Sequence, residues 1–307
     1  KMMEFYREYR ANVERGVYSL SQRASEEYER ARGKVADFIG AKSDREIIMT
    51  RNATEGINLV ANKRGWQKGD AIVTTLLEHH SNFIVWLRLR QRYGVQVDII
   101  RPTAEGLLDP GEFERAITDN TRLVAITHVS NVLGTVMPIR EIADMAHAHG
   151  ARILVDGAQS VPHMPLDVSR LDCDYLAFSG HKMLGPTGIG CLYVREELLN
   201  EMEPLSIGGN TIEDVTSDDY KLAPSPMRFE GGTPAIAEAI GLGAAIDYLR
   251  GIGLESVAEH EKALSQMIHR GLSSIKGVRL FGAVDWGLRT GIVSFNIADL
   301  NPHDVAL

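Results

Sequence analysis

The 307-residue sequence has little cysteine, no long apolar run and no cluster of basic residues. Its two cysteines exclude a disulfide framework and offer no paired metal-ligand spacing, so we predict no metal site. The apolar runs are far shorter than the ~20 residues of a membrane-spanning helix. The net charge is −8, from 33 basic and 41 acidic residues. We therefore predict neither nucleic acid nor a membrane as a partner.

No signal peptide is visible in the sequence, and the chain begins at Lys1 rather than at a methionine. We therefore expect a cytoplasmic protein whose natural N-terminus precedes this residue. Apolar residues make up 44% of the chain and charged residues 24%, which is typical of a soluble globular enzyme. A chain of this length can bury a large core and hold a second, smaller domain.

Short apolar runs alternate with helical patterns over most of the sequence. The predicted strands cover residues 46–50, 71–75, 95–100, 122–130, 151–156, 174–179 and 189–195. Helical patterns separate most of them, and Pro138 and Gly150 are typical of the start and the end of one such helix. This alternation predicts an α/β fold with a mostly parallel sheet that helices cover on both faces.

The pattern changes near residue 235, where two long helical segments follow one another. After them we predict one strand, at 291–297, and the sequence ends a few residues into another helical pattern. We therefore divide the chain into a large domain, 1–245, and a smaller α+β domain, 246–307. We expect the smaller domain to be incomplete at its C-terminal end, and the N-terminal segment is a candidate to pack on it.

Polar side chains follow the predicted strands at the points where the strands end. In open α/β sheets, ligands bind at the carboxyl ends of the strands, so these side chains should meet at one edge of the sheet. They are Thr54, His79, Asn131, Asp156, Gln159, Ser179, His181 and Lys182. An amine, a carboxylate, imidazoles, amides and hydroxyls together suit a cofactor with an aldehyde, a phosphate and a basic ring nitrogen. We therefore predict pyridoxal 5′-phosphate (PLP).

Lys182 is the residue that we expect to bind this cofactor covalently. It follows the apolar run 175–178 and precedes the segment "GPTGIG" (185–190), where glycines allow a ligand to approach closely. A lysine in a partly desolvated cleft has a depressed pKa and condenses with an aldehyde to a Schiff base. The alternative is a lysine on a surface loop, which is the commoner fate of this residue type.

Asp156 ends a predicted strand and precedes the small residues Gly157 and Ala158. A carboxylate there can pair with a protonated pyridine nitrogen and so keep the ring an electron sink. The alternative is an aspartate that caps a helix N-terminus. Gln159 is a candidate donor to the phenolic oxygen of the ring, or else a plain surface amide.

Thr54 opens a helical pattern, and its hydroxyl with the free N–H groups of that turn predicts a phosphate site, although capping explains the residue equally well. Ser179 and His181 are candidates to complete the phosphate site from the other side. An imidazole at His79 can lie on the face of the ring and move protons at neutral pH. The segment "EHH" alone is also typical of a polar loop.

At this point the motifs carry a family resemblance. "TRNATEGINLVA", "EHHSN", "THVSNVLGT", "VDGAQS", "FSGHKMLGPTGIG" and "RFEGGTP" resemble, in order and spacing, the class V aminotransferase-fold PLP enzymes. Within that group the chain most resembles the Suf-type cysteine desulfurases and the related selenocysteine lyases. The resemblance runs from about residue 12 to the end. It implies a fold-type I transferase with a mostly parallel seven-stranded sheet, and it implies a homodimer.

The resemblance also implies a role for each site residue. Lys182 would carry the cofactor, Asp156 would contact the pyridine nitrogen, and His79 would cover the ring. The remaining cofactor-binding residues are Gln159 and Asn131 near the phenolic oxygen, Thr54, Ser179 and His181 at the phosphate, and Thr233 of "GGTP" at the phosphate of the neighbouring subunit. The family often has a threonine at the position of Ala53, so the phosphate site would have one hydroxyl fewer here.

The activity implied is that of a cysteine desulfurase, which converts L-cysteine to L-alanine and passes sulfur to an enzyme cysteine and then to an acceptor for iron–sulfur cluster assembly. That chemistry needs an accessible thiolate. Cys173 and Cys191 adjoin or lie within apolar strands, and we expect both to be buried packing residues. The segment "LRTG" (288–291) is not the loop that carries the family's nucleophile, so we expect the thiol and the substrate-carboxylate arginine beyond this sequence.

Several alternatives stay open at the sequence level. A selenocysteine lyase or a cysteine-sulfinate lyase does not depend on an enzyme thiol. An aminotransferase, an epimerase and a kynureninase-like enzyme share the same fold. A PLP-fold scaffold that only binds a sulfur-acceptor protein is the alternative from outside the enzymes, and the intact Lys182 and Asp156 argue against it.

Overall fold

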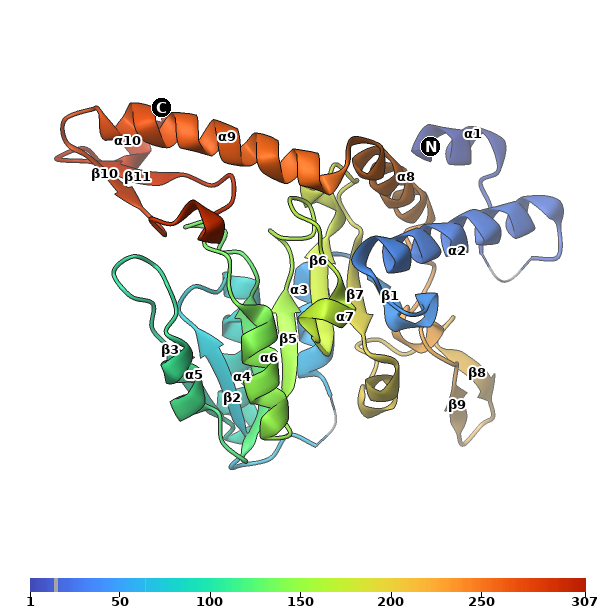
Figure 1. Ribbon diagram of the computed structural model, residues 1–307. Helices are drawn as coiled ribbons and strands as arrows, with labels where there is room; N and C mark the ends of the chain where they lie inside the picture. Colours follow the sequence, from blue (N-terminus) through green and yellow to red (C-terminus); the bar gives the residue numbers. More distant parts are fainter. Residues whose placement is uncertain (14–15, 64) are drawn as a thin grey trace.

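The computed structural model describes residues 1–13, 16–63 and 65–307, and its centre is a seven-stranded sheet (Figure 1). The strand order is β1-β7-β6-β5-β4-β2-β3. The strands are β1 (Ile47–Thr50), β2 (Ala71–Thr75), β3 (Gln96–Ile100), β4 (Thr121–Thr127), β5 (Arg152–Asp156), β6 (Tyr175–Ser179) and β7 (Gly190–Val194). The strands β6, β5, β4, β2 and β3 are mutually parallel, and β7 runs antiparallel to both of its neighbours. The predicted mostly parallel sheet is confirmed.

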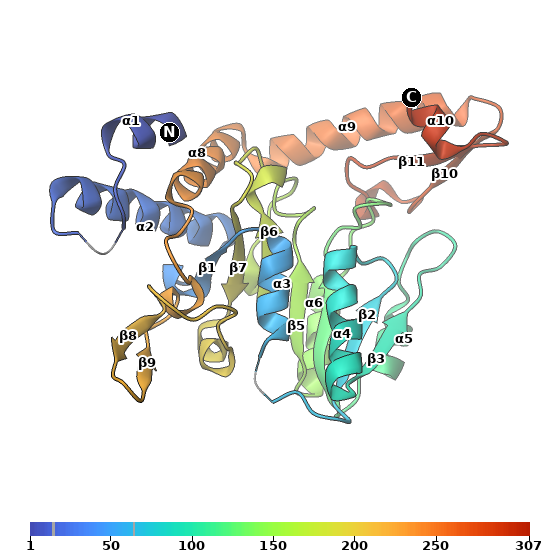
Figure 2. The same cartoon turned by 180° about the vertical axis from the view of Figure 1, so that it is seen from behind.

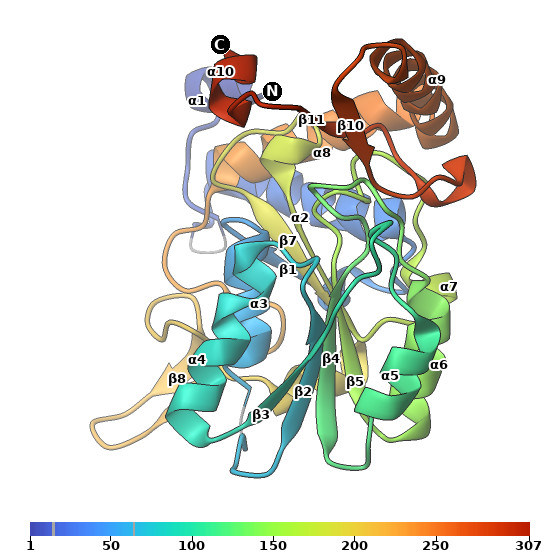
Figure 3. The same cartoon turned by 90° about the vertical axis from the view of Figure 1, so that its left-hand side faces the viewer.

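Helices cover both faces of this sheet (Figures 2 and 3). The helices of the described residues are α1 (Met2–Glu8), α2 (Ser19–Ile39), α3 (Ala53–Ala61), α4 (Ile84–Tyr93), α5 (Pro110–Ala116), α6 (Ile139–Ala148), α7 (Val168–Leu171), α8 (Ile236–Ile252), α9 (Leu254–Ser273) and α10 (Pro302–Ala306). One apolar core packs α3 and α4 on one face, and a second packs α2, α6 and α8 on the other. The central strands β5 and β6 are buried except at Arg152, the first residue of β5, which explains their continuous apolar runs.

The predicted strands lie close to the observed ones, with one clear difference. The strand expected at 122–130 ends at Thr127. Beyond it, Val129 forms only an isolated antiparallel bridge to Val136. The chain turns back at the carboxyl end of β4, and the loop that follows carries polar residues such as Asn131.

The C-terminal part holds one strand more than we predicted. The sequence indicated a single strand at 291–297, but β10 (Val278–Phe281) pairs antiparallel with β11 (Ser294–Ile297). β10 is half exposed and only four residues long, so its apolar pattern was weak. A hairpin of β8 (Ile212–Val215) and β9 (Tyr220–Leu222) was not predicted either, because most of its side chains are exposed and polar.

α8 and α9 lead from the sheet to this C-terminal part. α8 packs on α2, while α9 extends away from it toward β10 and β11 (Figure 1). Position 245 falls inside α8, and the division into 1–245 and 246–307 stays a prediction. Among the described residues, none of the helices combines the length and the hydropathy that crossing a bilayer requires.

Candidate active site

The carboxyl ends of four neighbouring strands lie side by side at one edge of the sheet. The terminal residues are Thr75 of β2, Thr127 of β4, Asp156 of β5 and Ser179 of β6. The pairing register aligns Thr127 with Asp156, and Asp156 with Ala177. Seven of the eight strand-end residues predicted from the sequence lie at the ends of these strands or in the loops that follow them. The eighth, Thr54, comes from the start of α3.

Asp156 is almost completely buried at this edge, with 4% of its surface exposed. Its Oδ1 accepts a hydrogen bond of 2.9 Å from the N–H of Ala158. Burial raises the pKa of the Asp156 carboxyl, while that hydrogen bond and the charges of Lys182 and His79 act in the opposite direction. The alternative of a helix cap does not apply, because residues 157–164 form turns rather than a helix.

Lys182 lies in a short 3-10 helix, Gly180–Lys182, that starts directly after β6, and its side chain is half-buried. The glycine-rich segment after it returns the chain to the sheet as β7. A Cβ at Gly190 would lie 2.6 Å from both the Cα of Asn52 and the carbonyl oxygen of Phe178. Only glycine therefore allows the turn before α3 to pack against the ends of β6 and β7.

This packing brings the N-terminus of α3 to the end of β6. The hydroxyl oxygen of Ser179 accepts a hydrogen bond of 2.9 Å from the N–H of Ala53. The cap of α3 is Asn52, whose side chain accepts from the N–H of Glu55 at 3.0 Å. Thr54 is consequently not the cap, and its exposed hydroxyl is directed to another residue.

That residue is Ser81, which the sequence analysis did not identify. The hydroxyl oxygens of Thr54 and Ser81 are 2.7 Å apart, and the Ser81 hydroxyl is 3.0 Å from Nδ1 of His79. Nδ1 also accepts from the N–H of Ser81 at 3.2 Å, so the proton of a neutral His79 ring is on Nε2. Ser81 lies two residues after His79 in the segment "EHHSN", and this proximity was the signal available in the sequence.

Glu78 is a second residue of this edge that the sequence analysis did not identify. Its carboxylate accepts hydrogen bonds from the hydroxyl of Thr75 at 2.8 Å and from the amide of Asn82 at 2.6 Å. Burial raises the pKa of Glu78 to about 8, and the nearby charge of Asp156 also raises it. Glu78 thus ties the end of β2 to the turn that carries His79.

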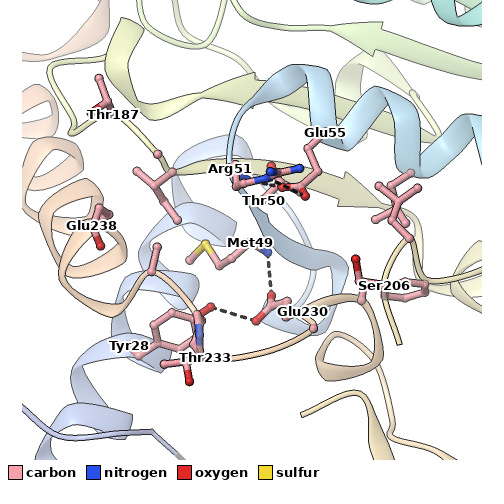
Figure 4. A pocket seen from close by; sticks show the side chains of 18 residues that line it. Tyr28, Met49, Thr50, Arg51, Glu55, Thr187, Ser206, Glu230, Thr233 and Glu238 are labelled. Carbon is pink, nitrogen blue, oxygen red and sulfur yellow. Dashed lines mark hydrogen bonds and ion pairs between the residues drawn. The ribbon is translucent and has the colours of Figure 1, made fainter. Parts of the chain in front are cut away.

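The remaining predicted residues occupy loops at the same edge, with one exception. Asn131 is half-buried in the loop after β4, Gln159 is half-buried in the turn after β5, and His181 is exposed next to Lys182. Thr233 instead lines a separate cavity of about 660 Å³ with Arg51, Thr187 and Glu230, among others (Figure 4). It is exposed, and it follows the short 3-10 helix Met227–Phe229 rather than a strand of the sheet.

Both cysteines are fully buried, as predicted from the sequence. Cys173 lies just before β6, and Cys191 lies within β7 beside Met49. Burial raises the pKa of each thiol well above its ordinary value, so both stay protonated at neutral pH. Neither side chain provides an accessible nucleophile.

The residues at this edge fit PLP. Asp156 is a buried carboxylate without an ion-pair partner among the described residues, and a pyridinium nitrogen would supply the missing positive charge. Lys182 provides an amine near that carboxylate, and the N-terminus of α3 with Thr54 and Ser179 provides donors for a phosphate.

Comparisons with known proteins agree with this geometry. A protein of Halalkalibacterium halodurans named probable cysteine desulfurase is 49% identical over 306 residues, which cover 99% of this chain and 75% of that protein. The apo structure of a cysteine desulfurase from Thermococcus onnurineus NA1 is 47% identical with a TM-score of 0.96, over 99% of this chain and 76% of that one. A structure of C-DES with glycine covalently linked to its PLP cofactor is 28% identical with a TM-score of 0.87, over 99% of this chain and 80% of that one.

The family profile described as aminotransferase class V matches residues 1–307. The lysine, the buried aspartate and the histidine at the ends of β6, β5 and β2 are the chemical groups that the motifs of this family led us to expect there. The chain belongs to the class V aminotransferase family.

Proposed function

We propose that this chain is a PLP-dependent cysteine desulfurase, which converts L-cysteine to L-alanine and transfers the sulfur to a thiol. The observation that carries this proposal is the position of Lys182 and His79 beside the buried Asp156. The cysteine desulfurases at 49% and 47% identity supply the substrate class.

When bound, PLP withdraws electrons from the bonds at the substrate Cα and Cβ. Asp156 holds the positive charge of the ring nitrogen, since its carboxylate is buried and otherwise lacks an ionic partner. Lys182 would hold the cofactor through its amine, and the same Nζ, once free, would be the base that takes the proton from the substrate Cα. His79 would lie over the ring, and its Nδ1 accepts a hydrogen bond from the N–H of Ser81, which orients the imidazole.

We assign the phosphate to the N-terminus of α3. Thr54, Ser179 and His181 are the side-chain donors, and the backbone N–H of Ala53 holds the Ser179 hydroxyl in place. Ser81 is within hydrogen-bond distance of both Thr54, which we assign to the phosphate, and His79, which we assign to the ring. It therefore holds these two side chains in a fixed position relative to each other. Asn131 and Gln159, from the loops after β4 and β5, are assigned to the phenolic oxygen.

The sulfur acceptor must be a thiolate other than Cys173 and Cys191, because both are buried and protonated. A thiolate attacks the sulfur of the substrate, the Cβ–S bond breaks, and the acceptor becomes a persulfide, while the carbon skeleton takes up a proton and leaves as L-alanine. No external oxidant or reductant is needed for this step. We further propose a Suf-type desulfurase in a reducing cytoplasm, in agreement with two unpaired cysteines, and a sulfur-acceptor protein that serves iron–sulfur cluster assembly.

The two buried cysteines favour one alternative, a lyase that acts on selenocysteine or cysteine sulfinate without an enzyme thiol. We also propose a homodimer in which Thr233 contacts the cofactor phosphate of the partner. Its exposure supports a role outside its own subunit.

Product analysis tests the activity. With PLP, L-cysteine and an excess of a dithiol as acceptor, we expect L-alanine and sulfide in equal amounts. Changing Cys173 and Cys191 together to serine should leave this rate unchanged. Pyruvate and ammonia as the products would contradict the proposal, and so would loss of sulfide release in a folded double variant. A much higher rate with selenocysteine or cysteine sulfinate would favour the lyase.

A further inference from the structure

Glu230 and Arg32 form an ion pair in the interior of the protein, directly before the turn that carries Thr233. The two nitrogens Nη1 and Nη2 of Arg32 donate to the two carboxylate oxygens of Glu230, at 2.6 and 3.0 Å. The side chains are only 1% and 4% exposed. Burial by itself would lower the pKa of Arg32, but the Glu230 carboxylate raises it well above its ordinary value, so Arg32 keeps its charge in the interior.

The Glu230 carboxylate accepts two further hydrogen bonds. The hydroxyl of Tyr28 donates at 2.9 Å, and the backbone N–H of Met49 donates at 2.7 Å (Figure 4). Arg32 in turn donates to the carbonyl oxygen of Ile47 at 2.9 Å. The pair is therefore tied to α2 and to two residues of β1, the edge strand of the sheet.

A buried ion pair is a costly way to stabilise a fold. Apolar residues of similar size often serve equally well, because desolvation of two charges offsets most of their attraction. What the pair does provide is a fixed position, since four donors in defined directions leave one orientation for the Glu230 carboxylate. The chain continues from that fixed point into Gly231, Gly232 and Thr233.

The turn itself is held at its backbone. The side-chain amide of Asn210 donates to the carbonyl oxygen of Glu230 at 3.2 Å, and the N–H of Gly232 donates to the carbonyl oxygen of Gly209 at 2.8 Å. Gly232 has φ of +85°, which suits glycine. Thr233 thus follows the anchored Glu230 by three residues. Its exposed side chain lies at the wall of the 660 Å³ cavity (Figure 4).

We propose that Tyr28, Arg32 and Glu230 are positioning residues that fix the turn 231–233, and with it the Thr233 hydroxyl, where the cofactor phosphate of a partner subunit binds. This inference rests on the proposed function, and it assigns the buried ion pair to cofactor retention rather than to the stability of the fold.

The test measures the dissociation constant of PLP from the dimer by fluorescence titration of the apo protein, and the ³¹P signal of bound PLP. The variant Arg32→Met with Glu230→Leu removes both buried charges, and Glu29, which also pairs with Arg32 at 3.0 Å, is exposed and stays solvated. We expect a folded dimer with a dissociation constant about tenfold higher and a shifted ³¹P signal. The control is Asp70→Asn with Arg122→Met, which removes an ion pair of 2.9 Å outside the residues assigned to the cofactor. This control variant should change neither the dissociation constant of PLP nor the ³¹P signal.

A double-mutant cycle that combines Thr233→Val with the ion-pair variant separates this inference from the proposed function. If Thr233→Val leaves PLP binding unchanged, the phosphate role of Thr233 is wrong and this inference falls with it. If Thr233→Val weakens binding, the ion-pair variant should add little in that background, because it acts through the same hydroxyl. Full additivity, or normal PLP binding by the folded ion-pair variant, would overturn the inference while leaving the proposed function intact.

Tyr28→Phe covers the case in which the ion-pair variant does not fold. It removes one hydrogen bond from Glu230 and leaves the charges paired. We expect Tyr28→Phe to raise the dissociation constant of PLP severalfold in the unchanged protein. It should have no such effect in a protein that already carries Thr233→Val. An unchanged dissociation constant for Tyr28→Phe would contradict the inference.

Discussion

Asp156 and Glu78 are acidic residues at the same edge of the sheet, but their hydrogen-bond partners differ. The Asp156 carboxylate accepts one hydrogen bond, from a backbone N–H, and Lys182 and His79 lie near it. Glu78 is surrounded by neutral donors. Asp156 is thus suited to pair with a cationic ligand, while Glu78 is suited to hold the local backbone.

Asp156→Asn tests the first of these roles. The amide keeps the size of the side chain but cannot hold the positive charge of the ring nitrogen. We expect bound PLP and a normal fold, with turnover reduced at least about a hundredfold, as for loss of a preorganised electrostatic group. Steady-state kinetics of the PLP-saturated variant provide the measurement. Turnover close to that of the unchanged protein would rule out this role.

Glu78→Gln tests the second role through pH. The folded-state pKa of Glu78 is about 8, above its ordinary value of 4.5, so the folded protein binds this proton more tightly than the unfolded chain. Stability should therefore fall as the pH rises from about 4.5 to 8. The Glu78→Gln variant lacks this loss of stability. The difference between its Tm and that of the unchanged apo protein should therefore increase by at least about 2 °C, in favour of the variant, from pH 5 to pH 8. A Tm difference independent of pH would contradict the assignment.

Most of the residues that sequence reasoning identified follow an apolar strand, while Thr54 lies at the start of α3 and Thr233 follows a 3-10 helix. Lys182 and Asp156 were found in this way because the carboxyl edge of a parallel sheet is the expected ligand site. Ser81 and Glu78 were not found, because their roles depend on hydrogen bonds to residues that only the turn geometry brings close. The pairing of Arg32 with Glu230 joins positions 198 residues apart, and local sequence carries no signal for it.

At the scale of elements, α3 is central because its N-terminus lies at the end of β6. Asn52→Ala removes the cap of this helix, and we expect a loss of about 1 kcal/mol in the free energy of unfolding. Urea unfolding of the apo protein gives this value. Asn58→Ala is the matched control in the same helix, since Asn58 does not cap it, and it should cost less. Equal effects of the two changes would refute a special role for the cap.

The long elements were easier to predict than the short exposed ones. The central strands β5, β6 and β7 are buried on both faces, so their apolar runs were clear in the sequence. β10 and the β8–β9 hairpin are short and largely exposed, and their pairing rather than their composition makes them strands. The N-terminal α1 and α2 were not predicted as elements, although α2 packs closely on α8.

At the scale of the whole molecule, the central question is whether two subunits share each cofactor site. Lys182→Ala and Thr233→Val should each be nearly inactive as homodimers. A hybrid of the two contains one site with both Lys182 and Thr233, because each residue comes from a different subunit. Mixing, unfolding and refolding equal amounts should restore about a quarter of the unchanged activity, since half of the dimers are hybrids with one intact site. No recovery in verified hybrid dimers would contradict shared sites.

The central claim is that Lys182 carries PLP at the edge of the sheet beside Asp156. The most direct measurement is reduction of the PLP-loaded protein with borohydride, followed by mass spectrometry of its peptides. We predict a pyridoxyl-phosphate mass on the peptide that contains Lys182, and no modified peptide from the Lys182→Ala variant treated in the same way. Modification fixed at another lysine, or a protein that binds PLP without any reducible linkage, would contradict the account.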